Sequence, residues 1–193
     1  MERIYPNKTE IKDTLEKIRL ANHIQRYQLI KRYLYGNVLD IACGVGYGCE
    51  LISNVPDIKK IYGVDRDNES IKYAHNTYKN KKIEFSVNDI KTIKRDDIDC
   101  LVSLETIEHL LDINDYSIMV KRIRPELIVV SYPNKKSTHF NKFHFQDLCK
   151  QDIVDLLPDY HIVRQEKQQY DVSILVLVKN PENMPKHVLN NYD

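Results

Sequence analysis

Short apolar runs alternate with amphipathic segments along most of the chain. The apolar runs have the length and the flanking turn residues of buried strands. They fall at residues 38–42, 61–64, 83–87, 100–104, 127–131, 160–164 and 172–178. Helical spacing of apolar residues recurs between them, at 49–55, 68–78, 116–124 and 146–157. Because strands separated by helices pair in parallel, this alternation predicts an α/β fold with a mostly parallel seven-stranded sheet and helices on both faces.

The length and the charge of the chain limit the kinds of protein it can be. With 193 residues and no internal linker or repeat, we expect one domain, residues 1–193, in which residues 1–35 form a helical cover at the N-terminus. The formal net charge of +1 argues against a broad nucleic-acid surface, although a local basic patch would still fit.

Several features of the sequence indicate a cytoplasmic protein. The first residues, MERIYPNKTEIK, contain no apolar segment of the kind that a secretory signal needs. The longest apolar run near the C-terminus, Ile174 to Val178, is far too short to cross a bilayer, so we expect no membrane partner. The four cysteines lack the CxxC spacing of a zinc site, and we interpret them as reduced thiols.

Three of the five glycines directly follow the first predicted strand, in the stretch VLDIACGVGYG. Gly44, Gly46 and Gly48 let the backbone turn sharply with nothing projecting, so that a ligand can lie against the main chain. Asp65 ends the next strand, about twenty residues further on, where a carboxylate can accept both hydroxyls of a ribose. The pattern predicts a nucleoside cofactor at the carboxyl ends of the strands.

Two classes of nucleoside cofactor fit such a loop. Dinucleotides favour the spacing GxGxxG, which presents a helix end to a pyrophosphate, whereas this loop reads GxGxG and follows Asp40. A nicotinamide-dependent oxidoreductase is therefore the weaker alternative. Taken together, the segments VLDIACGVGYG, IYGVDRD, FSVNDI and DCLVSLETIEHL resemble the class I S-adenosylmethionine-dependent methyltransferases, most clearly over residues 22–131. The resemblance implies a Rossmann-like, doubly wound sheet whose last strand is antiparallel.

The resemblance also implies which residues contact S-adenosylmethionine. Those expected at the methionine half of the cofactor are Asp40, Ala42, Cys43, Gly44, Gly46 and Leu104, and we expect Tyr47 and Glu105 to contact the cofactor as well. Those expected at the adenosine half are Asp65 on the ribose, Arg66 beside the adenine, and Asn88, Asp89 and Ile90 along the adenine edge.

The segment NHIQRY, residues 22–27, is similar to the leader of several such enzymes, including the ubiquinone-type O-methyltransferases. In those enzymes an arginine about twenty residues before the glycine loop contacts the carboxylate of the cofactor, and Arg26 matches it. A guanidinium suits this role because it can engage a carboxylate with two parallel hydrogen bonds. The alternative is that Arg26 is a solvated charge on a helix.

The segment LETIEHL, residues 104–110, follows the fourth predicted strand, where the reacting methyl group should lie. Methyl transfer is an in-line displacement, so the protein positions the acceptor and removes its proton. We consider Glu105, His109 and His144 the candidate catalytic residues, with His109 as a general base whose pKa the neighbouring glutamates would raise.

The same residues suggest two alternatives to a general base. Glu105, Glu108, His109 and His144 could hold Mg²⁺, Mn²⁺ or Zn²⁺, because carboxylates and imidazoles suit these cations. The motif ETIEH followed by FHF resembles the ExxEH motif and later histidine that Hen1-type small-RNA 2′-O-methyltransferases use for a metal. In the other alternative, Glu108 and His109 only begin a helix and face water.

The acceptor has to lie between the helical N-terminus and the loop of residues 131–148, because no sizeable substrate domain is inserted. We expect the acceptor to be a hydroxyl of a sugar or another small metabolite. Lysines and aromatic residues interleave in the loop and could instead stack on RNA, which makes a metal-assisted RNA 2′-O-methyltransferase the alternative enzyme. A non-catalytic module that only binds the cofactor is a further alternative.

Overall fold

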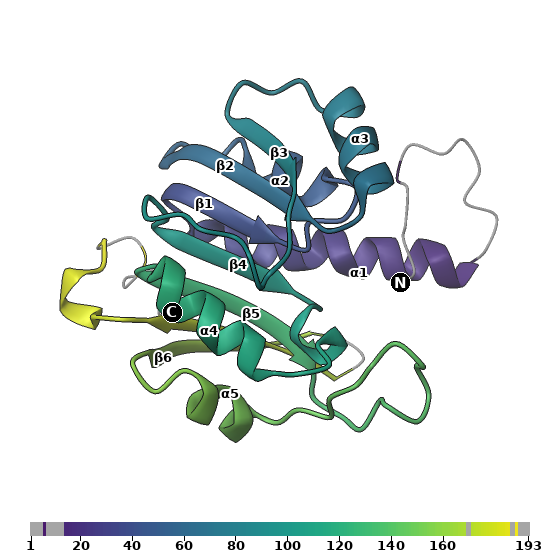
Figure 1. The fold of residues 1–193 in the computed structure, drawn as a ribbon, viewed down its shortest axis with the longest axis vertical. Coiled ribbons are helices and arrows are strands. Elements are labelled where there is room, and N and C mark those ends of the chain that lie inside the picture. The colour runs from purple at the N-terminus through teal and green to yellow at the C-terminus, as the bar shows by residue number, and fades with distance from the viewer. Residues whose placement is uncertain (1–5, 7–13, 169–170, 186–187, 189–193) are drawn as a thin grey trace.

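A seven-stranded sheet forms the centre of the computed structural model, which describes residues 6, 14–168, 171–185 and 188 (Figure 1). The strand order is β3-β2-β1-β4-β5-β7-β6. The strands are β1 (Gly36–Ile41), β2 (Ile58–Asp65), β3 (Ile83–Val87), β4 (Cys100–Leu104), β5 (Leu127–Pro133), β6 (His161–Gln168) and β7 (Val172–Val178). β1 to β5 pair in parallel, and β7 runs antiparallel to both β5 and β6. The predicted sheet, including its antiparallel last strand, is confirmed.

Helices cover both faces of the sheet, as the sequence predicts (Figure 1). The helices are α1 (Thr14–Ile30), α2 (Tyr47–Ile52), α3 (Asn68–Thr77), α4 (Asn114–Ile123) and α5 (Lys150–Leu156), with short 3-10 turns η1 (Lys31–Tyr33), η2 (Ile107–His109) and η3 (Pro181–Asn183). The apolar residues of α1, α2 and α3 pack on one face, and those of α4 and α5 pack on the other. Within the described residues, no helix is long and apolar enough to cross a bilayer.

Most predicted elements begin or end one to three residues from their bounds in the structure, and two ends differ by four residues. The helix expected at residues 146–157 begins only at Lys150, because the Asp152 carboxylate accepts a hydrogen bond from the Cys149 backbone N–H and caps the helix there. β6 continues to Gln168 rather than ending at Arg164, because its polar half still pairs with β7. The helical N-terminal cover is present from Thr14, and the rest of the expected cover, residues 1–5 and 7–13, lies outside the described residues.

α1 packs against α2 where the aromatic ring of Tyr27 lies directly on Gly48. A Cβ atom added to Gly48 would overlap the ring of Tyr27, so α1 can approach α2 this closely only because position 48 has no side chain. The same ring lies edge-on to Tyr47 at a centroid distance of 6.1 Å. Gly48 thus sets the position of the helical cover relative to the sheet.

We expect Gly48→Ala to lower the free energy of unfolding by about 1–3 kcal/mol, because the methyl group forces the Tyr27 ring out of its place. Chemical denaturation of both single variants and the double variant checks this. In a Tyr27→Ala background the clash is absent, and the same substitution should be neutral or stabilising by up to about 1 kcal/mol, since alanine favours a helix over glycine. An equal loss in both backgrounds would contradict the packing role.

Candidate active site

Two adjoining cavities lie at the carboxyl ends of the central strands. The larger has a volume of about 560 Å³ and the smaller about 60 Å³, and Ala42 and His109 line both. Seven residues predicted to contact the cofactor, most of them at its methionine half, line the larger cavity: Arg26, Ala42, Cys43, Gly44, Tyr47, Leu104 and Glu105. Residues predicted for the adenosine half line the smaller cavity: Asp65, Arg66, Asn88, Asp89 and Ile90. Of the residues predicted to contact the cofactor, only Asp40 and Gly46 line neither cavity.

The loop after β1 has the backbone conformation that its glycines favour. Gly44 and Gly46 have φ values of 58° and 84°, in the left-handed region where only glycine is unstrained. The Gly44 N–H donates a hydrogen bond of 2.9 Å to Oδ2 of Asp65, and the Asp67 N–H donates one of 2.9 Å to Oδ1. Asp65 therefore joins the loop after β1 to the end of β2, and its carboxylate is fixed at the edge of the smaller cavity.

The three glycines of the loop do not all serve a ligand surface. Gly44 lines the larger cavity. A Cβ atom at Gly46 would lie 2.7 Å from the Ala74 Cβ and from the Phe85 ring, so this glycine admits close packing against α3 and β3. Gly48 packs against Tyr27 in the same way. The predicted contact between Gly46 and the cofactor remains a prediction.

Asp40 lies in β1 behind the glycine loop and lines neither cavity. Its carboxyl group is buried and accepts hydrogen bonds from the Tyr27 hydroxyl at 3.0 Å and the Cys49 thiol at 3.3 Å. Burial raises the pKa of Asp40 to about 7, and the hydrogen bonds from Cys49 and Tyr27 offset part of that rise. Asp40 joins α1, α2 and β1, and its predicted contact with the cofactor stays a prediction.

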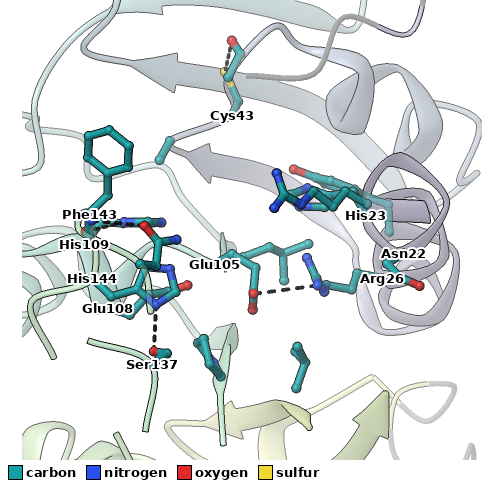
Figure 2. Close-up of a pocket in the computed structure, with 18 of the residues that line it drawn as sticks. Asn22, His23, Arg26, Cys43, Glu105, Glu108, His109, Ser137, Phe143 and His144 are labelled. Carbon is teal, nitrogen blue, oxygen red and sulfur yellow. Dashed lines mark hydrogen bonds and ion pairs between the residues drawn. The ribbon is translucent and has the colours of Figure 1, made fainter. Parts of the chain in front are cut away.

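Arg26 points from α1 into the larger cavity and is only 5% exposed, so it is not a solvated helix charge (Figure 2). Its Nε donates a 2.7 Å hydrogen bond to Oε1 of Gln168, and its Nη2 lies 3.6 Å from Oε2 of Glu105. Its Nη1 is buried and has no hydrogen-bond partner. A guanidinium N–H inside a cavity with no acceptor is suited to a ligand carboxylate.

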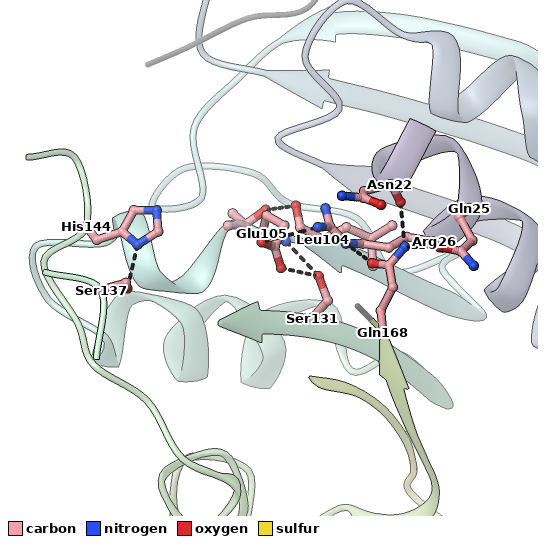
Figure 3. Close-up of polar contacts among 10 residues, drawn as sticks. Asn22, Gln25, Arg26, Leu104, Glu105, Ser131, Ser137, His144 and Gln168 are labelled. Carbon is pink, nitrogen blue, oxygen red and sulfur yellow. Dashed lines mark hydrogen bonds and ion pairs between the residues drawn. The ribbon is translucent and has the colours of Figure 1, made fainter. Parts of the chain in front are cut away.

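Glu105 is held in an unusual backbone conformation beside Arg26 (Figure 3). Its φ is 50°, a value that a residue with a side chain adopts only under constraint. Ser131 at the end of β5 supplies that constraint: its Oγ accepts a hydrogen bond from the Glu105 N–H and donates another to Oε1, both at 2.9 Å. The Glu105 side chain is therefore turned toward Arg26 rather than toward the histidines.

Glu108, His109 and His144 meet at the other end of the larger cavity (Figure 2). One possible ligand atom from each lies within 4.8 Å of the others. The backbone N–H groups of Phe145 and Gln146 donate to the Glu108 carbonyl oxygen at 2.8 and 3.2 Å, which brings the loop that carries His144 back onto η2. The structure thus assembles three of the four predicted metal ligands, whereas Glu105 pairs with Arg26.

The Glu108 carboxyl group is 1% exposed, and neither of its oxygens has a hydrogen-bond partner. The interpretation that this residue faces water is therefore wrong. Burial raises its pKa well above the ordinary value, and the negative charge of Glu105 raises it further. A buried carboxyl group without a partner is rare in proteins, and it indicates a ligand.

Hydrogen bonds orient both imidazoles of the cluster. His109 Nδ1 lies 2.7 Å from the Phe143 carbonyl oxygen, which can only accept, so Nδ1 carries a proton and Nε2 is the ring nitrogen that remains for a ligand. His144 Nδ1 lies 2.7 Å from the Ser137 hydroxyl. Burial lowers the pKa of His144, and the neighbouring His109 lowers it further. Both rings are thus oriented to act as bases or as metal ligands.

Sequence reasoning missed His23 and Gln168. His23 lines the larger cavity, and burial together with Arg26 and Arg19 lowers its pKa to about 4, so that its imidazole is neutral at pH 7. It precedes Arg26 by three positions, a spacing that puts two residues on one helix face and could have revealed it. Gln168 lies 142 residues from Arg26, and no local pattern marks it.

Comparison with known proteins relates this chain to methyltransferases. Residues 38–127 match the family model described as a methyltransferase domain. A Mycobacterium tuberculosis protein named "Probable S-adenosylmethionine-dependent methyltransferase" is 28% identical over 156 residues, which cover 75% of this chain and 56% of the relative. The chain spans about half the length of the curated relatives that it matches.

Solved structures have the same fold at low sequence identity. Magnesium protoporphyrin IX methyltransferase from Synechocystis PCC 6803, solved with bound S-adenosylhomocysteine, superposes with a TM-score of 0.74 at 16% identity, over 89% of this chain and 90% of that one. The methyltransferase domain of a bacterial Hen1 gives a TM-score of 0.64 at 20% identity, over 86% and 98%. With its sheet order, its paired cavities and the match over residues 38–127, the chain is similar to the class I S-adenosylmethionine-dependent methyltransferases.

The buried Asp40 should make the stability of the protein depend on pH. Its pKa is about 7 in the folded state and about 3.9 in an unfolded chain, so folding takes up a proton between these values. Its contribution to the free energy of unfolding is full below about pH 4 and is lost as pH rises to about 7.

Asp40→Asn cannot titrate and keeps an oxygen to accept from Tyr27. Relative to this variant, the wild-type protein should therefore lose stability from pH 4 to 7 and show a constant difference above about pH 8. Urea denaturation across that range measures the difference. The exposed Asp159, changed to Asn, is the matched control and should give no such trend. A pH-independent difference between wild type and Asp40→Asn would rule out a raised pKa.

Proposed function

We propose that this protein transfers the methyl group of S-adenosylmethionine to a hydroxyl of a sugar or another small metabolite. The observation that carries the proposal is the unpartnered, buried Glu108 carboxyl group, which lies with two oriented imidazoles in the cavity that also contains Arg26. Chemistry that deprotonates an oxygen needs basic groups at the methyl end of the cofactor, and this cluster supplies them.

The cavities suggest how the cofactor lies. The methionine half would occupy the larger cavity, with its carboxylate at Arg26, and the adenosine half would reach the smaller one, with its ribose at Asp65. His109 lines both cavities, so the sulfonium between the two halves would lie near its ring. The acceptor would enter the remaining part of the larger cavity, between α1 and the loop that carries Ser137 and His144.

The cluster fits a divalent cation. One carboxylate and two imidazoles form a donor set that Mn²⁺ and Zn²⁺ accept readily, and both Glu108 oxygens are free for it. A cation held there would lower the pKa of the acceptor hydroxyl and orient it. The hydrogen bonds to Phe143 and Ser137 keep the two imidazoles in place whether or not a cation is bound. In the absence of a cation, Nε2 of His109 is the group that would accept the proton.

An RNA end is the second candidate acceptor. The loop after β5 exposes three aromatic side chains, with Phe140 80% exposed and Phe143 and Phe145 partly so, and Phe143 lines the larger cavity. Lys135 and Lys142 lie among them, and Lys142 sits over the Phe143 ring. Aromatic rings beside lysines can stack on bases and contact phosphates. The likeness to a bacterial Hen1 domain favours this candidate, whereas the balanced charge of the whole chain favours a small acceptor.

The metal site can be tested without knowing the acceptor. We expect chelator-treated protein to bind one Mn²⁺, measured from the loss of the free-ion electron paramagnetic resonance signal. Glu108→Gln and His144→Ala should each weaken binding at least roughly tenfold, because each removes one ligand of a small set. His139→Ala, an exposed histidine of the same loop, is the matched control and should bind as wild type does. No Mn²⁺ binding to the wild-type protein would leave His109 as a general base without metal.

Methyl transfer itself can be tested with two sets of candidate acceptor molecules. Protein with methyl-labelled S-adenosylmethionine is incubated with free sugars and nucleosides, and separately with short single-stranded RNAs, with and without Mn²⁺. We expect label in the small hydroxylated acceptors and its loss in Glu108→Gln. Label in RNA alone would favour the second candidate. Cofactor binding without transfer to either set would favour a non-catalytic module.

A further inference from the structure

The guanidinium of Arg26 is held from two strands that are far apart in the sequence (Figure 3). Gln168, the last residue of β6, accepts from Nε at 2.7 Å, and Glu105, just after β4, lies 3.6 Å from Nη2. The third nitrogen, Nη1, is buried without a partner. Two of the three nitrogens are therefore fixed by the protein, and the third is left for a ligand.

Gln168 is itself fixed by α1. Its Nε2 donates to the Asn22 carbonyl oxygen and to Oε1 of Gln25, both at 2.8 Å, and the side chain is buried. One amide thus binds the backbone of the helix and the side chain of Arg26 at the same time. Its orientation is determined, because Nε of Arg26 can only donate and the Asn22 carbonyl can only accept.

The side chain that binds Nε of Arg26 is a neutral amide and not a carboxylate, and this difference affects how strongly Arg26 attracts a ligand. A carboxylate at Nε would neutralise the guanidinium and weaken its attraction for a second anion. The neutral amide fixes the plane of the guanidinium and leaves its charge in place. The Glu105 carboxylate lies at the longer distance of 3.6 Å from Nη2 and also accepts a hydrogen bond from the Ser131 hydroxyl. It therefore offsets only part of the attraction of Arg26 for an anionic ligand.

We propose that Gln168 is a positioning residue that aims Nη1 of Arg26 at the α-carboxylate of the bound cofactor. The inference rests on the proposed function, because it needs S-adenosylmethionine in the larger cavity. It makes the end of β6 part of the cofactor site, although Gln168 itself does not line the cavity.

Two ligands separate this role from general structural support. S-adenosylhomocysteine carries the carboxylate, whereas 5′-methylthioadenosine has the same nucleoside and thioether without the amino-acid half. We expect Gln168→Leu to weaken S-adenosylhomocysteine roughly tenfold by calorimetry, as loss of a hydrogen bond to a charged group does, and to change 5′-methylthioadenosine by less than about twofold. Arg26→Ala should give the same selective loss. Gln165→Leu, on an exposed position of the same strand, should change neither affinity.

A double variant tests whether Gln168 acts through Arg26. If it does, Arg26→Ala with Gln168→Leu should bind S-adenosylhomocysteine as Arg26→Ala alone does, within about twofold. Additive losses, an unchanged affinity in Gln168→Leu, or equal losses for both ligands would overturn the proposal. If wild-type protein binds both ligands equally, the carboxylate is not recognised, and the proposal fails while the cofactor site stands. If wild-type protein binds neither, the proposed function fails as well.

Discussion

The buried carboxyl group of Asp40 is the contact on which the arrangement of the site depends. It lies in β1 and accepts a hydrogen bond from α1, through Tyr27, and one from α2, through Cys49. Because Gly48 leaves room for the Tyr27 ring, α1 is positioned both by a polar bond and by close packing. Arg26 and His23 reach the cavity from this helix, so its position relative to the strand determines where the charged end of a ligand can bind.

The larger cavity contains buried charged groups that lack hydrogen-bond partners, an arrangement that is unfavourable unless a ligand is bound. Among the described residues, three charged side chains have a buried atom without a hydrogen-bond partner, and two of these, Arg26 and Glu108, line this cavity. One is a cation and the other an acid, and Glu105 lies between them. A ligand with an anionic group at one end and a hydroxyl or cation at the other would satisfy both.

Much of the fold could be predicted from the sequence, because strands buried on both faces are nearly continuous apolar runs. β4 and β5 are of this kind, and their positions were clear. The polar second half of β6 cannot be predicted from the sequence, since it pairs at the sheet edge and carries no apolar pattern. The sequence predicts too early a start for α5, because the apolar spacing of the helix continues into the capped loop before it.

The predicted site residues fell into two groups for a physical reason. Side chains close to the ends of β1, β2 and β4 meet because parallel strands end at one edge, so Asp65 and Glu105 could be placed from their positions alone. The side chains that pair with these residues could not be predicted in this way. Local spacing says nothing about which side chain turns toward Arg26, and the choice between Glu105 as a metal ligand and as an ion-pair partner depends on Ser131, a residue of another strand.

The pairing of Arg26 with Gln168 links the order of folding to the ability to bind. The two residues are 142 positions apart, and contacts of such separation close a long loop, so they form after local helices and neighbouring strands. During synthesis the parallel part of the sheet can assemble before β6 and β7 exist, but Nε of Arg26 gains its Gln168 partner only when the final hairpin joins β5. A cofactor that needs Arg26 would therefore stabilise the finished domain and give little support to any earlier intermediate.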